Sequence, residues 1–115
     1  MDERLEKALE FSNYMSTLNN QKRLLHESYI DSSVHYLNGG KFNVTKELIN
    51  FCNTLLANNQ TTAVLIDDNN IPIEVEDLQT FFEELINIYF VATNEYLTKY
   101  TSIKKQRSVA GLLDI

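Results

Sequence analysis

Two long stretches at the ends of the chain carry apolar residues at alternating spacings of three and four, the pattern of a helix that packs along one stripe. The first covers residues 2–29 and the second residues 75–105. Each stripe has one charged interruption, Lys22 in the first and Lys99 in the second. Only three glycines and one proline occur in 115 residues, so little interrupts such elements. The sequence therefore predicts two long amphipathic helices packed antiparallel, in the manner of a coiled coil.

The segment between these helices begins with a predicted β-hairpin. Residues 33–37 and 41–44 are short β-prone runs on either side of an Asn-Gly turn at residues 38–40, which is the strongest local hairpin signal. Apolar residues at helical spacing then predict a middle helix over residues 44–57.

A second hairpin is predicted from residue 62 to residue 73. Residues 62–66 form a continuous apolar run that we interpret as a buried strand. The turn that follows begins at Asp67 and resembles a calcium loop only superficially. An EF-hand starting there requires glycine at the sixth position and glutamate at the twelfth, where this chain has Pro72 and Leu78. We therefore interpret the turn as solvated and the strand that contains Pro72 as an edge strand.

Together these elements predict a single α+β domain over residues 1–107. Its two long amphipathic helices lie at the chain ends, with a small antiparallel sheet of two hairpins and a middle helix between them. Residues 108–115 form an apolar C-terminal tail. This tail either packs against the domain, which is the more ordinary outcome, or docks onto a partner.

The second long helix is more apolar than one neighbouring helix requires. Between Phe81 and Phe90, apolar side chains occupy much of its circumference. The first helix and the sheet could cover this surface, and so could a second copy of the chain. We expect a homo-oligomer. The candidate interaction residues are Phe81, Ile88, Phe90 and Tyr100 on the helix and Leu112, Leu113 and Ile115 in the tail.

The net charge of −6 disfavours nucleic acid and anionic lipid as partners, because both are negatively charged. Basic residues nevertheless gather at the end of the second long helix, where the helix dipole favours them. They are an alternative nucleic-acid site, with Tyr96 and Tyr100 available to stack on bases. The candidate residues of this alternative are Lys99, Lys104, Lys105 and Arg107.

No pattern of reactive residues predicts an enzyme. The metal-ligand candidates His26, His35 and Cys52 lack the short spacing of a metal clip. Adjacent acids such as Glu83 and Glu84 do not face each other on a helix. We therefore expect no catalytic residue, no metal and no cofactor. The single cysteine, the charged N-terminus and the lack of a membrane-length apolar run predict a cytoplasmic protein.

Residues 64–73, followed by residues 94–97 and 104–109, resemble small proteins of T4-like marine bacteriophages. This resemblance covers most of the chain and implies a short accessory or assembly protein made in a bacterial cytoplasm, with no established activity to carry over. The ending at residues 111–115 also resembles the terminal peptides with which phage replication and late-transcription proteins bind a sliding clamp.

These observations predict a non-enzymatic, oligomeric protein that acts in protein–protein interaction or assembly. The alternative is an accessory factor in nucleic-acid transactions, in replication or transcription, that acts through the basic helix end and the tail.

Overall fold

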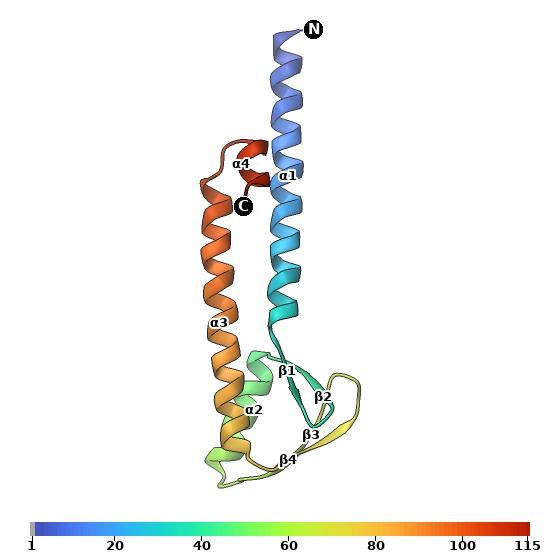
Figure 1. Ribbon diagram of the computed structural model, residues 1–115, viewed down its shortest axis with the longest axis vertical. Coiled ribbons are helices and arrows are strands. Elements are labelled where there is room, and N and C mark those ends of the chain that lie inside the picture. The colour runs from blue at the N-terminus through green and yellow to red at the C-terminus, as the bar shows by residue number, and fades with distance from the viewer. Residues whose placement is uncertain (1) are drawn as a thin grey trace. The chain divides into compact units, whose positions relative to one another are not determined.

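The computed structural model describes residues 2–115, and in that range the chain forms four helices and four strands (Figure 1). The α+β class predicted from the sequence is confirmed, and both long helices are present. In chain order the elements are α1 (Glu3–Ser32), β1 (Val34–Leu37), β2 (Gly40–Asn43), α2 (Lys46–Ala57), β3 (Ala63–Ile66), β4 (Pro72–Val75), α3 (Leu78–Lys105) and α4 (Val109–Leu113).

Contacts divide the chain into two compact units. Unit 1 combines the described residues up to Tyr29 with Asn94–Ile115, and unit 2 is Ile30–Thr93. Unit 1 therefore contains most of α1, the end of α3 and α4. Unit 2 contains both hairpins, α2 and the first half of α3.

The two hairpins of unit 2 form two separate sheets, each with two antiparallel strands. The prediction of one small sheet built from both hairpins is therefore wrong in this respect. In the first hairpin, Leu37 opposes Gly40, so that two residues make the turn. Asn38 has a φ of 49° and Gly39 a φ of 81°, and positive φ at both positions is what a type I′ turn requires.

Aspartate side chains occupy the place where a further strand would complete one sheet. Asp67 Oδ2 accepts a hydrogen bond from Lys41 N at 3.0 Å, and Asp68 Oδ2 accepts one from Asn43 N at 3.0 Å. Asp68 N also donates to Lys41 O at 2.9 Å. The outer edge of β2 is therefore covered by the turn between β3 and β4 rather than by a strand.

The prediction that this turn is solvated is wrong for Asp67, whose side chain is buried with a relative exposure of 4%. Its Oδ1 atom accepts hydrogen bonds from Asn69 N at 2.9 Å and Ile71 N at 2.8 Å. The turn thus orders its own backbone around one carboxylate, which is the behaviour of an Asx-type turn.

The core of unit 2 forms where α2 and α3 cover one side of the hairpins. Thr45 caps α2, and its side chain accepts a hydrogen bond from Leu48 N, which satisfies one of the N–H groups that have no partner within the helix. Phe81 of α3 packs edge-on against Phe42 of β2, with ring centroids 5.2 Å apart. The buried core residues are Phe42, Val44, Cys52, Leu65, Ile73, Val75, Leu78, Phe81 and Leu85.

The core of unit 1 is smaller and joins α1, the end of α3 and α4, which lies beside α1 in Figure 1. Ser108 caps α4, and its hydroxyl accepts a hydrogen bond from Gly111 N at 3.1 Å. Gln21 of α1 donates to Leu112 O at 2.8 Å, and Tyr14 donates through its hydroxyl to Gln106 O at 2.9 Å. The buried residues are Leu25, Ile103 and Leu112, and those packed on them are Tyr14, Leu18, Tyr96 and Tyr100.

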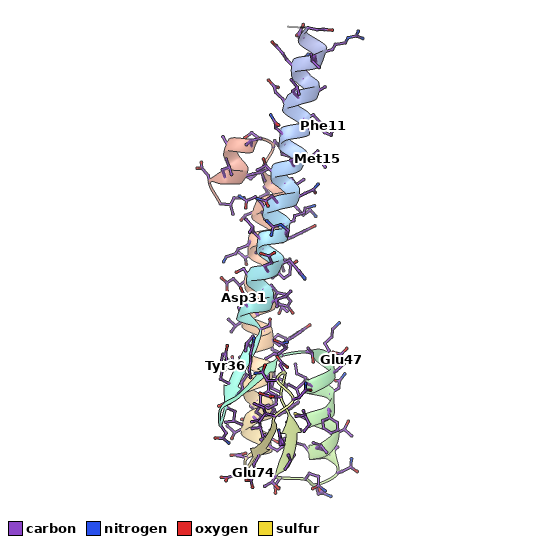
Figure 2. All side chains as sticks on the ribbon, turned by 90° about the vertical axis from the view of Figure 1, so that its right-hand side faces the viewer. Phe11, Met15, Asp31, Tyr36, Glu47 and Glu74 are labelled. Atoms are coloured by element: carbon purple, nitrogen blue, oxygen red, sulfur yellow. The ribbon has the colours of Figure 1, made fainter. Side chains whose placement is uncertain are left out.

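The first turns of α1 lie outside this core. Phe11, labelled in Figure 2, is 66% exposed although it continues the stripe that is buried at Leu25. Leu5 and Leu9 are also exposed. None of the helices described for residues 2–115 combines the length and the apolar character that a bilayer crossing requires.

Candidate functional site

The chemically reactive side chains of the described residues either lie apart from one another or already bind neighbouring groups. Within residues 2–115, no three His, Cys, Asp or Glu side chains come close enough to hold a metal ion. Cys52 lies in the core of unit 2 with no exposed surface. Burial raises the pKa of its thiol, which disfavours the thiolate that nucleophilic chemistry needs.

One shallow cavity of about 290 Å³ lies beside β1 and α3 in unit 2. Glu84 Oε2 lies 3.0 Å from His35 Nε2, but the two atoms are not aligned as a hydrogen bond. The pair attracts as an ion pair when the imidazole is protonated. The residues that line the cavity are His35, Thr80, Glu83, Glu84, Asn87 and Ile88.

This cavity holds an imidazole and carboxylates but no available nucleophile. The Thr80 hydroxyl donates to Asp77 Oδ2 at 2.7 Å, so its hydrogen is already committed at the start of α3. The His35 ring lies against Phe81, with centroids 5.5 Å apart. Sequence spacing missed this cavity because His35 lies on β1, far in sequence from the acids of α3, and no local motif links them.

The helix residues predicted to form an interaction face do not share one environment. The prediction that Phe81 lies on an exposed face is wrong, because its side chain is 2% exposed in the unit 2 core. Ile88 is half-buried against the same core. Phe90 is 57% exposed. Tyr100 is half-buried in unit 1, where the amino groups of Lys22 and Lys104 approach its ring at 5.6 and 5.9 Å.

The candidate interaction residues of the C-terminal tail likewise differ in burial. The prediction that Leu112 belongs to a free docking surface is wrong, because α4 buries this side chain completely. Leu113 and Ile115 remain exposed, at 65% and 50%. Only these two apolar residues of the predicted tail surface are therefore accessible to another protein.

The β3–β4 hairpin exposes an apolar surface that the sequence analysis missed. The sequence predicts a buried strand over residues 62–66, but of these only Leu65 is buried, and Val64 and Ile66 are 65% and 62% exposed. Ile71, in the turn, is 47% exposed. The error has a simple cause: helices cover one side of this hairpin, so its side chains alternate between core and solvent. The solvent side of β3 is apolar as well, whereas Glu74 lies opposite Val64 on β4.

The basic residues of the alternative nucleic-acid site lie at the end of α3 and just beyond it. Lys99 forms an ion pair with Glu95 at 2.8 Å, one turn earlier on α3, so its charge is partly offset. Arg107 donates to Lys104 O at 3.3 Å and thereby satisfies the end of the helix. Lys105 is exposed.

Comparisons of this chain with protein-family models, with curated proteins and with solved structures find no significant match.

Proposed function

We propose that this chain is a non-enzymatic protein that acts by binding protein chains, including copies of itself. The observation that carries the proposal is the apolar surface of unit 2, where Val64, Ile66 and Phe90 are exposed by 65%, 62% and 57%. Burying apolar surface on association lowers the free energy by roughly 25 cal/mol per Å². Val64 and Ile66, which share one face of β3, form an exposed apolar surface of the kind that commonly marks an interaction site.

Unit 1 supports the same proposal with a second set of accessible apolar side chains. Phe11 on α1 and Leu113 on α4 are 66% and 65% exposed. We propose that the end helices pack antiparallel. Two contacts support this arrangement. The Tyr14 hydroxyl, early in α1, donates to Gln106 O just after α3 at 2.9 Å, whereas His26 Nδ1, later in α1, lies 3.3 Å from the hydroxyl of Tyr96, which is earlier in the chain than Gln106.

The proposal that this chain is not an enzyme rests on two reactive groups that are already bonded or enclosed. The Thr80 hydroxyl beside the His35–Glu84 pair is bonded to Asp77, and the Cys52 thiol is enclosed in the core. We extend the proposal to a cytoplasmic accessory or assembly role in phage-infected bacteria, which rests on the sequence resemblance alone.

Light scattering on the purified full chain, over a wide range of concentration, tests self-association. The expected result is a mass that rises with concentration to that of two or more subunits. A mass of one subunit at every concentration would remove the proposal that the chain binds copies of itself.

The second candidate function is a role in nucleic-acid transactions. It is favoured by Lys104, Lys105 and Arg107, which have no ion pair among the residues that the structure describes. Clustered basic side chains bind nucleic-acid phosphate most strongly at low salt. A mobility-shift experiment at low salt, comparing the natural chain with K104E/K105E, decides this. If the natural chain retards DNA or RNA and the double variant does not, the role in nucleic-acid transactions is supported. If the natural chain causes no retardation, this candidate function is excluded.

A further inference from the structure

The outer edge of β3 is formed by the backbone groups of Val64 and Ile66, which we call the β3 edge. In an antiparallel pair, residues alternate between those that exchange backbone hydrogen bonds with the opposite strand and those that do not. Asp67 N donates to Ile71 O at 2.9 Å, so this pair is of the bonded kind. Two positions back in the same register, Leu65 is bonded as well. The N–H and C=O groups of the β3 edge therefore point away from β4.

No hydrogen bond joins the β3 edge to any other residue in the range 2–115. Unpaired strand edges are templates for pairing with another chain, and folds usually block them with proline, charge or covering side chains. The outer edge of β4 is blocked in this way, because Pro72 has no N–H and Asn38 Nδ2 donates to Glu74 O at 3.0 Å. Asp67 and Asp68 cover the edge of β2.

The outer edge of β1 is the other candidate for pairing, and charge disfavours it. Glu84 lies 3.0 Å from His35 of that strand, and Glu83 lines the same cavity. Two copies that met along β1 would bring these carboxylates toward each other, and like charges at short range repel.

The β3 edge, in contrast, suits a chain whose net charge is −6. The strand Ala63–Ile66 contains no charged residue. Of the acids that follow it, Asp67 is buried and accepts a hydrogen bond from Lys41 N, whereas Asp68 is exposed and accepts one from Asn43 N of its own subunit. A second copy can therefore approach this edge without facing a carboxylate on the strand.

We propose that two copies of the chain pair antiparallel through the β3 edge, around a twofold axis at Leu65. Val64 of one subunit then lies opposite Ile66 of the partner subunit, and each such pair exchanges two N–H···O bonds. The pairing extends each two-stranded sheet into one sheet of four strands. The β-branched side chains of opposite residues also come into contact on the exposed face. This inference rests on the proposed self-association and names its surface and its partner.

Val64→Pro tests the pairing without disturbing the subunit. The proline removes an N–H that points away from β4, so the ladder inside the hairpin is kept. Two of the four intermolecular bonds are lost, and we expect the dissociation constant to rise roughly tenfold or more. The matched control is Tyr36→Pro, which removes an outward N–H from β1 and should leave the dissociation constant unchanged.

Ile66→Lys is a second variant with the same purpose, in case Val64→Pro does not fold. It places a charge at the β3 edge and should also weaken self-association at least tenfold. Circular dichroism checks that each variant is folded. Variants that are folded and associate as tightly as the natural chain overturn the β3 pairing but leave the proposed function standing. A natural chain that is monomeric at every concentration removes both.

Disulfide formation tests the register. Opposite residues of a bonded antiparallel pair have Cα atoms about 5.5 Å apart, within the range that a disulfide spans. Under oxidised glutathione, a mixture of the Val64→Cys and Ile66→Cys variants should form a covalent dimer containing one chain of each, and to a greater extent than either variant alone. Equal cross-linking in all three samples would overturn the proposed register.

Discussion

Asp67 Oδ2 lies 3.0 Å from Lys41 N and accepts its hydrogen bond, so a side chain from the second hairpin covers the edge of the first. The other oxygen of the same carboxylate accepts from Asn69 N and Ile71 N. One buried side chain therefore shapes its own turn and joins the two sheets of unit 2. Gly40 also lies close to the second hairpin, because a Cβ at this position would come 2.6 Å from Ile73 Cγ1.

Asp67→Asn should lower the free energy of unfolding more than Asp68→Asn does. An amide has one acceptor oxygen, whereas the Asp67 carboxylate uses both of its oxygens for three backbone N–H groups. Asp68 is exposed, and its carboxylate accepts one such bond. Urea unfolding of the two variants measures the difference. Equal loss of stability in both would contradict the role given to Asp67.

The stability of the natural chain should fall in acid, in part through Asp67. Hydrogen bonds from the backbone of Lys41, Ile71 and Asn69 lower the pKa of this carboxyl, although burial opposes them. Since the folded pKa lies below the unfolded value, the stabilisation is complete above about pH 4, the usual value for an unfolded aspartate. It is lost as the pH falls through the folded pKa.

Urea unfolding at a series of acid pH values measures how steeply the free energy of unfolding falls with pH, and Asp67→Asn should reduce this slope. Asp77→Asn is a useful comparison, because hydrogen bonds from the backbone and side chain of Thr80 lower the pKa of Asp77 in the same direction. A slope that is unchanged in the Asp67 variant would show that other groups cause the acid sensitivity.

Phe81 and Phe90 should respond to substitution in opposite ways. Phe81→Ala removes a buried ring that packs on Phe42 and should lower the free energy of unfolding by about 3 kcal/mol. Phe90→Asp changes a ring that is 57% exposed, so it should leave stability nearly unchanged but weaken self-association. Thermal unfolding and light scattering measure the two effects. A folded Phe90 variant with an unchanged oligomer mass would exclude Phe90 from the contact.

Leu112 and Leu113 provide a matched pair in the C-terminal helix. Leu112 has no exposed surface, whereas Leu113 is 65% exposed. Leu112→Ala should destabilise unit 1 by about 2 kcal/mol or more, and Leu113→Ala should change stability by less than about 0.5 kcal/mol. Hydrogen exchange of α4 amides reports the loss locally. Equal protection in both variants would contradict the packing of α4.

The sequence predicted those features that depend on local spacing. The stripes that end at Tyr29 and Ile103 gave both long helices, and the turn at Asn38 and Gly39 gave the first hairpin. Spacing along a helix cannot show what covers each face. The helix pattern therefore predicts Phe81 on an interaction face, although Phe42 of a distant strand covers it.

The role of Asp67 and the exposure of Val64 could not be predicted for a related reason. The partner of Asp67 is the backbone of Lys41, and any residue type supplies a backbone N–H, so the sequence holds no signal for it. The apolar run that contains Val64 is equally suited to a strand covered on both faces. Only the arrangement of helices on one side leaves Val64 in solvent.

Sedimentation equilibrium of the full chain, compared with Val64→Pro, tests the central claim that the chain self-associates through the exposed edge of β3. We expect the natural chain to reach the mass of at least two subunits at high concentration and to dissociate on dilution, with the variant shifted toward the single subunit. A natural chain that sediments as one subunit at its highest attainable concentration would contradict the claim.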